Sequence, residues 1–317
     1  MKKIIYFPSY LARKFYQVII LSFLGIFSIL SVQAQERSVF NLYNHYQPII
    51  NPAAMGSYDH FTMALLFNHQ MGGFDGAPIH ALLDITAPLG KSNAILGGQY
   101  AMDKIGNRFY NYLNVNFAYR VRLSLKHYLS FGISAGMQNV NIDYTQLTTN
   151  PDPSIINQQV NQFAPDFKLG AYYFADRLYV GFATNNLIKL RPNDPIMQVN
   201  INDIQFMLHG GYRIPFNDVW SLTPSLLFKQ IVGSPLQIDV NLNVLYNQVF
   251  GFGLSYRTLE TFLVQLNVKI AKQWFLGYGY NMGLGFRDNK FYHGHEVMLL
   301  FNGLNGKKKL PVSCPRF

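Results

Sequence analysis

Apolar and polar residues alternate strictly over long stretches of this chain. In the segment 236–246, LQIDVNLNVLY, every second residue from Leu236 to Val244 is apolar, and polar residues stand between them. The segments 111–123 and 260–270 follow the same rule. Such alternation indicates β-strands with one apolar and one polar face. Ordinary strands average about five or six residues, whereas a tilted membrane-spanning strand needs about 9–11. These strands are therefore long enough to cross a membrane.

Composition narrows the class of protein. The chain has 317 residues, of which 49% are hydrophobic and 15% aromatic, but only 13% are charged. An average soluble domain carries about a quarter charged residues. Beyond the first thirty-odd residues, no apolar run approaches the roughly 20 residues that a spanning helix needs. These features favour an outer-membrane β-barrel, and the alternative is a large soluble β-sandwich.

The pattern predicts an all-β fold, a transmembrane antiparallel β-barrel of about fourteen strands. An even number is the rule in bacterial single-chain barrels. The connections predict its orientation, because short turns are typical of the periplasmic side and longer loops of the outside. The longer connections expected are 68–77, 103–110, 139–165, 185–202 and 283–292. The strands expected are 60–68, 78–87, 93–102, 111–123, 127–138, 166–175, 177–184, 203–214, 219–230, 236–246, 248–256, 259–270, 273–282 and 293–302.

The two ends of the chain carry separate features. Residues 1–34 resemble a cleavable signal peptide, with Lys2, Lys3, Arg13 and Lys14 before an apolar core and Ala34 at the cleavage site. An uncleaved anchor is the alternative. Residues 35–59 are expected to form an N-terminal periplasmic or plug segment, 60–302 the barrel and 303–317 a periplasmic tail. The single cysteine, Cys314, excludes an intramolecular disulfide.

The polar faces of the expected strands are rich in small and amide residues, which leave room in a lumen for water or a plug. These are Gly97, Gly132, Ser134, Gly136, Gly170, Gly181, Gly277, Gly279, Asn241, Asn243 and Asn267. Aromatic residues that suit interfacial girdles are Tyr100, Tyr119, Tyr212, Trp220, Tyr246, Tyr256 and Trp274. The net charge is +10, but no basic stretch interleaves with aromatic residues, so no nucleic-acid partner is expected.

Several motifs, in order along the chain, resemble the PorP/SprF family of outer-membrane β-barrels associated with the type IX secretion system. They include HYQPIINPAAMGS, FDGAPIHALLDITAPLG, HYLSFGISAGMQ, HGHEVMLLFN and the terminal SCPRF. One departure follows Gln70, where Met71, Gly72 and Gly73 replace the aromatic residue that the family often carries. The chain therefore lacks the bulky side chain that a partner contact at this position would need.

The resemblance implies a non-enzymatic function in protein secretion, gliding motility or cell-surface anchoring. The implied partners are secreted type IX cargo, such as the C-terminal domain of a surface adhesin, and periplasmic or other envelope components. Outer-membrane lipid would surround the barrel. Whether the chain serves the anchoring or the translocation branch stays open, and an autonomous solute channel is the alternative function. The candidate partner-binding residues are Phe74, Asp75, Asp152, Asn193 and Asp194 on outward loops, and Phe317 in the tail.

Candidate chemistry is sparse, and no catalytic, cofactor-binding or metal site is predicted. His293 and His295 share one strand face with Glu296 opposite, but a metal would need a third ligand. His69, Asp75 and His80 lie in or beside one loop without a serine or cysteine nucleophile, which leaves an outer-membrane hydrolase as a minor hypothesis.

Charged and glycine residues elsewhere have simpler interpretations. Asp103, Lys104 and Asp143 are expected on loops, whereas Arg120 and Asp239 fall on lumen faces and need partners or water. The glycines at 72, 73 and 76 precede a strand rather than a helix, so they indicate a hairpin and not a phosphate-binding loop.

Overall fold

The computed structural model describes residues 40–72, 75–90, 92–143, 159–187, 204–232, 234–258, 261–283 and 293–303. The strands are β1 (Thr62–Gln70), β2 (Ile79–Pro88), β3 (Ala94–Ile105), β4 (Arg108–Arg122), β5 (Tyr128–Asp143), β6 (Gln159–Phe174), β7 (Leu178–Asn185), β8 (Gln205–Tyr212), β9 (Ile214–Pro215), β10 (Trp220–Ile231), β11 (Gln237–Tyr246), β12 (Phe250–Arg257), β13 (Thr261–Lys269), β14 (Trp274–Gly283) and β15 (His293–Asn302). Among the described residues, none of the helices has the length and apolar character that a membrane crossing requires.

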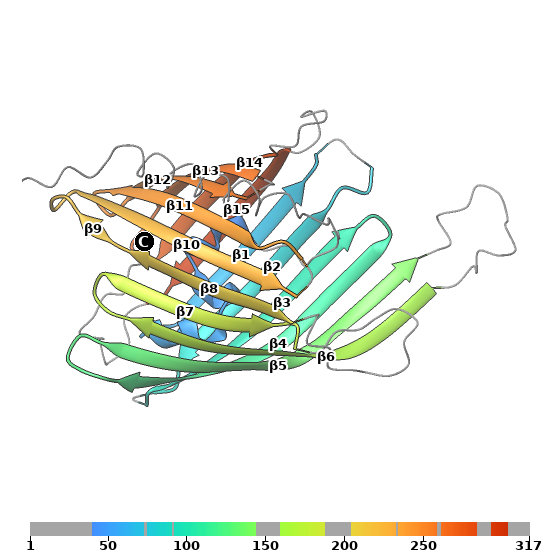
Figure 1. Cartoon of the computed structure of the whole chain (residues 1–317), viewed down its shortest axis with the longest axis horizontal. Coiled ribbons are helices and arrows are strands. Elements are labelled where there is room, and N and C mark those ends of the chain that lie inside the picture. The colour runs from blue at the N-terminus through green and yellow to red at the C-terminus, as the bar shows by residue number, and fades with distance from the viewer. Residues whose placement is uncertain are drawn as a thin grey trace, which may run out of the picture. The chain divides into compact units, whose positions relative to one another are not determined.

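The strands form one closed antiparallel sheet (Figure 1). Apart from β8 and β9, consecutive strands pair with each other, and β1 pairs with β15 from Thr62 opposite Asn302 to Gln70 opposite Gly294. The short β9 and β8 both pair with β10 and are separated by Arg213 alone, so they occupy one position in the wall. The wall therefore has the fourteen strand positions that the alternation predicts.

The alternation also correctly predicts which face points inward. On β4, the apolar Leu113 and Val115 are 63% and 60% exposed on the outer wall, whereas Asn114 and Asn116 are buried. On β13, Leu266 is exposed, and Gln265 and Asn267 are buried. This is the arrangement of a barrel whose outer surface meets an apolar solvent.

Two long connections are shorter than predicted. β5 continues to Asp143 and β6 begins at Gln159, so the ends of the expected loop 139–165 are strand. The amides and Pro165 of this region suggest a loop, but Pro165 lies in the part of β6 beyond its ladder with β7, which begins at Leu169. A proline is tolerated at such an edge.

The expected loop 103–110 is also wrong. β3 runs to Ile105, β4 begins at Arg108, and only a two-residue turn joins them. Asp103, Lys104 and Asp143 therefore lie in strands rather than loops.

Aromatic residues gather on the outer wall at the end where the short turns lie. Trp220, at the start of β10, packs on Tyr246 with ring centroids 4.6 Å apart, and Trp274 packs on Phe301 at 4.9 Å. The other residues predicted for girdles are also exposed on the outer wall, namely Tyr100, Tyr119, Tyr212 and Tyr256.

Residues 40–58, the luminal segment, lie inside the ring of strands. They form three short 3-10 helices, η1 (Asn41–Asn44), η2 (Gln47–Ile49) and η3 (Pro52–Ser57). Nearly every residue of this segment is buried, and its polar atoms bond to inward-facing residues of the wall. Proline at the start of η2 and of η3 favours a helix start, because its missing N–H has no intrahelical role there.

Candidate functional site

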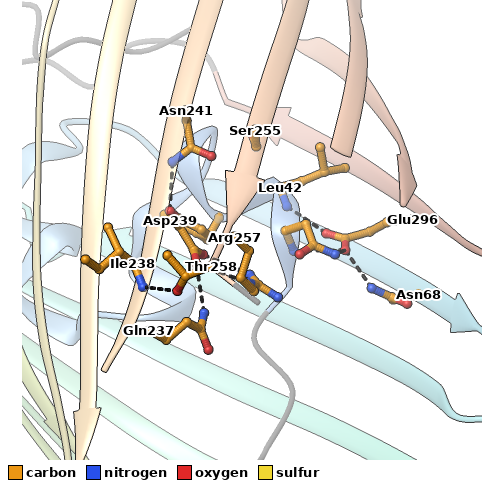
Figure 2. Close-up of polar contacts among 12 residues, drawn as sticks. Leu42, Asn68, Gln237, Ile238, Asp239, Asn241, Ser255, Arg257, Thr258 and Glu296 are labelled. Atoms are coloured by element: carbon orange, nitrogen blue, oxygen red, sulfur yellow. Dashed lines mark hydrogen bonds and ion pairs between the residues drawn. The ribbon is translucent and has the colours of Figure 1, made fainter. Parts of the chain in front are cut away.

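A buried carboxylate on β15 holds the start of the luminal segment. Glu296 accepts hydrogen bonds from the backbone N–H groups of Asn41, at 2.9 Å, and Leu42, at 2.8 Å. The amide nitrogens of Asn41 and Asn68 also donate to it, at 3.1 and 2.7 Å. Figure 2 shows Glu296 between Leu42 and Asn68. The inward alternation of β15 places this carboxylate, and the unsatisfied N–H groups that begin η1 supply its partners.

Gln265 on β13 holds the next part of the segment. Its Oε1 atom accepts from Asn44 Nδ2 at 3.1 Å and lies 2.9 Å from His45 Nε2. Burial lowers the pKa of His45 to about 4, although the hydrogen bond to Gln265 opposes the shift. His45 is therefore neutral at physiological pH.

Tyr46 links η1 and η2 to β2. Its hydroxyl donates to Asp84 Oδ1 at 2.6 Å and lies 3.1 Å from Thr86 Oγ1. Gln99 on β3 donates to the second oxygen of Asp84 and accepts from Lys168 on β6 at 2.8 Å. Burial raises the pKa of Tyr46, and the neighbouring Asp84 acts in the same direction. The tyrosine is therefore a neutral hydrogen-bond donor.

An ion pair lies beside η1 at the ends of β11 and β12. Arg257 donates to both oxygens of Asp239, at 3.0 and 2.9 Å, and Gln237 donates to Asp239 at 2.8 Å (Figure 2). Asn241, two residues further on, donates to the Tyr43 hydroxyl at 2.8 Å. Both lumen-face predictions for charged residues are confirmed, since Asp239 is paired and Arg120 donates to the Gly56 carbonyl at 3.0 Å.

The end of the luminal segment packs closely on β3 to β7. Asn51 caps η3 by accepting from Ala53 N at 2.9 Å, and it donates to the Ala171 carbonyl at 3.1 Å. A Cβ atom added to Gly132 would lie 2.6 Å from the Ala53 Cα atom, and one added to Gly97 would lie 2.7 Å from the Met55 sulfur. The inward glycines therefore make space for η3.

The residues predicted for partner binding are only partly within the described structure. Asp75 is exposed in the connection between β1 and β2. Phe74, Asp152, Asn193, Asp194 and Phe317 lie outside the described residues. Gly76 has a φ angle of 76°, which suits the hairpin turn expected there.

The histidines do not assemble into a reactive group. His69 faces outward on β1 and the buried His80 faces inward on β2, so the wall separates them. His80 Nδ1 lies 2.9 Å from Asp103, whose burial on β3 corrects the expectation of a solvated loop charge. His293 and His295 bond to the hydroxyls of Tyr280 and Tyr278, at 2.9 and 2.8 Å. Within the described ranges, no three His, Cys, Asp or Glu side chains are grouped as a metal site needs.

Sequence reasoning missed the residues that hold the luminal segment. Glu296 is considered only beside its histidine neighbours, and Asn51, Asn68, Gln265 and Tyr46 are not singled out. The available signal is their position, because an inward polar residue in a barrel wall needs a partner inside.

Comparison with known proteins agrees with the geometry. A family model described as "Type IX secretion system membrane protein PorP/SprF" matches residues 32–301. No curated protein sequence matches the chain.

One solved structure shares the architecture at low sequence identity, and two others match with lower scores. The CymD monoaromatic hydrocarbon channel is 12% identical with a TM-score of 0.50, and the match covers 84% of this chain and 94% of that one. A TodX deltaS2S3 mutant monoaromatic hydrocarbon channel is 10% identical with a TM-score of 0.47, over 84% and 94%. The KdgM porin is 12% identical with a TM-score of 0.38, over 77% and 99%. At this identity, the likeness to CymD concerns the fold alone.

Proposed function

Because the chain belongs to the PorP/SprF family of type IX secretion system membrane proteins, we propose that it docks or anchors secreted cargo at the outer membrane. The cargo is a secreted protein such as a surface adhesin, recognised through its C-terminal domain. The outward loops of the barrel bind it without bond chemistry, and the periplasmic tail contacts other envelope components.

One observation carries the proposal: the luminal segment occupies the barrel interior and bonds to its wall. A barrel filled in this way is poorly suited to steady transport through its centre. Its outer wall is apolar and suits lipid. The polar connections at the ends of the strands then provide the surfaces for a protein partner.

The loop residues take definite parts in this proposal. Phe74 and Asp75 present an aromatic ring and a charge in the first outward connection, and Asp152, Asn193 and Asp194 present hydrogen-bonding groups in the two longest ones. Aromatic residues are enriched at the centres of protein interfaces. In the proposal, Phe317 of the tail contacts an envelope component rather than the cargo.

Loop replacement tests the docking proposal. Residues 144–158 and 188–203 are each replaced by a short Gly-Ser linker, and the turn 124–126 is replaced in the same way as a control at the other end. Affinity purification from native membranes with mass spectrometry measures bound cargo, and surface labelling measures its retention. We expect both loop variants to lose cargo and the control to keep it. Intact cargo retention in both loop variants would contradict the proposal.

Point variants refine the test. We expect Phe74→Ala, Asp75→Ala and Asp194→Ala to weaken cargo capture while Phe317→Ala leaves it unchanged. Capture of an envelope component should show the reverse pattern. Equal effects of all four variants on both partners would argue against two separate binding ends.

The second candidate function is an autonomous outer-membrane solute channel, which the amide-lined wall of β11 and β13 favours. Asn241, Asn243, Gln265 and Asn267 all face inward there. Planar-bilayer recording separates the candidates: a steady conductance of the purified, unmodified chain supports the channel, and a silent barrel supports docking.

A further inference from the structure

The two halves of the luminal segment are held in different ways. The second half, from Asn51 to Ser57, interlocks with the wall. Gly132 has no space for a single added carbon against Ala53, and Arg120 donates to the Gly56 carbonyl at 3.0 Å. Moving η3 would therefore open a void over β4 to β6, which is costly in a packed interior.

The first half, from Asn41 to His45, combines hydrogen bonds to wall side chains with the packing of Leu42 and Tyr43 in the apolar core. Glu296, Gln265 and Asn241 supply the hydrogen bonds. Its apolar Leu42 rests over Gly277 and Gly279, whose added Cβ atoms would lie at an ordinary 3.5 Å from it. Leu42 therefore contacts these glycines at an ordinary distance and is not locked between them. Water can replace each of the hydrogen bonds.

One side chain, Glu296, accepts several of the hydrogen bonds that hold the start of η1. It is fully buried, and none of the ion pairs among the described residues involves it. Its oxygens are satisfied by four N–H groups, of which three belong to Asn41 and Leu42. A buried carboxylate depends strongly on such donors, so Glu296 and η1 hold each other in place.

The lumen contains amide atoms without a hydrogen bond, on the wall around η1 and on Asn44 of η1 itself. Within the described part of the chain, Asn44 Oδ1, Asn68 Oδ1, Asn281 Oδ1 and both amide atoms of Asn267 are buried without a hydrogen bond. Unsatisfied buried amides are costly, and water or a polar solute would satisfy them. The space that η1 closes is therefore suited to hydrophilic molecules.

We propose that residues 41–45 are a gate and Glu296 is its latch, and that release of the gate opens a passage along β11 to β15 for small uncharged hydrophilic solutes. Residues 51–57 stay in place as the anchor. The lining carries amides and hydroxyls beside apolar side chains such as Leu263 and Met298, and its charged Asp239 and Arg257 neutralise each other. Glu296 adds one carboxylate, which its variants remove. The gate concerns the lumen alone and is independent of cargo docking at the loops.

Planar-bilayer recording of the purified full-length chain in potassium chloride tests the gate. The unmodified chain should be almost silent. Glu296→Ala removes all four hydrogen bonds, and Glu296→Gln keeps the volume but replaces one acceptor with a donor. We expect both to raise the open probability about tenfold or more, which corresponds to the loss of one hydrogen bond of ordinary strength. Under a salt gradient, the reversal potential of both Glu296 variants should stay near zero, because the passage then carries no net charge.

The matched control is Asp166→Asn. Asp166 is also a buried, inward carboxylate, and the partners resolved for it are the wall residues Asn114 and Lys168. This variant should remain silent. Conductance equal to that of Glu296→Ala would show that any loss of luminal charge opens the barrel, and would overturn the assignment of a latch.

Thiol protection locates the moving part independently of conductance and of folding. In a Cys314→Ser background, Leu42→Cys reports on the gate, because Leu42 bonds to Glu296 through its backbone N–H. Ala54→Cys reports on the anchor. Adding Glu296→Gln should expose the first thiol to a water-soluble reagent and leave the second protected. Exposure of both would indicate a loosened barrel, and protection of both with a silent bilayer would overturn the proposal. Cargo capture by the same variants should be unchanged, so failure of the gate and failure of docking are distinguishable.

Discussion

The fit between η3 and Gly132 leads to a quantitative prediction for the variant Gly132→Ala. The added carbon would lie 2.5 Å from the Pro52 carbonyl carbon and 2.6 Å from the Ala53 Cα atom. Both are backbone atoms, so no side chain can rotate away, and η3 must shift. Overpacking of this kind costs about 1–3 kcal/mol.

The control for this prediction is Gly98→Ala. Gly98 lies in β3, and an added carbon there has nothing within 4 Å. Both substitutions restrict the unfolded chain alike, which by itself stabilises by about 0.4–1 kcal/mol. The difference between the two variants therefore isolates the clash with the luminal segment.

Equilibrium unfolding in urea, in lipid vesicles, measures that difference through the fluorescence of Trp220 and Trp274. We expect Gly132→Ala to unfold at a lower urea concentration than the parent chain, and Gly98→Ala at an equal or higher one. Equal midpoints for the two variants would refute the close packing of η3 on β5, and with it the division into anchor and gate.

Two further predictions concern ionisable groups in the lumen. The pKa of His45 is about 4 in the folded protein against 6.5 in the unfolded chain, so the unfolded state binds more protons between these values. The contribution of His45 to the free energy of unfolding should be fully present above about pH 6.5 and fall by about 3 kcal/mol as the pH is lowered to 4. The free energy of unfolding should depend less steeply on pH in His45→Gln. Arg257→Gln leaves the buried Asp239 without its cation and should cost about 3–5 kcal/mol. The second change Asp239→Asn should restore most of that loss in urea unfolding, and an unrestored double variant would mean that Arg257 acts through packing instead.

The wall of this barrel could be predicted from the sequence because each strand meets two different environments. Lipid-facing positions on β4, β11 and β13 must be apolar, and luminal positions are polar or small, so the period of two is visible in the residues themselves. The prediction fails where that contrast fades. At the ends of β5 and β6 both faces carry amides, and the ladder continues because each strand has the other as its neighbour.

The luminal segment could not be predicted in the same way. Its 3-10 helices are too short to leave a periodic pattern, and its partners are far away in the chain: Asn41 and Glu296 are 255 positions apart. The sequence does indicate the wall that surrounds this segment, because the inward glycines at 97 and 132 predict a lumen with room for a plug. Residues 35–59 are predicted as either a periplasmic or a plug segment, and the sequence does not decide between the two.

Those glycines connect the stability of the wall to the luminal segment. A glycine within a strand weakens the strand, since it has no side chain to pack and loses more backbone entropy on folding. In this barrel, Met55 and Ala53 occupy the space that side chains at 97 and 132 would fill, so η3 completes the core of β3 to β6 from inside. By contrast, the wall beside η1 combines hydrogen bonds with the packing of Leu42, and an added carbon at Gly277 or Gly279 would meet Leu42 at an ordinary 3.5 Å. If the whole segment served only to fill the barrel, a close fit along its full length would be the simpler arrangement. The difference between its two halves is what we expect when one half stabilises the wall and the other must be able to leave it.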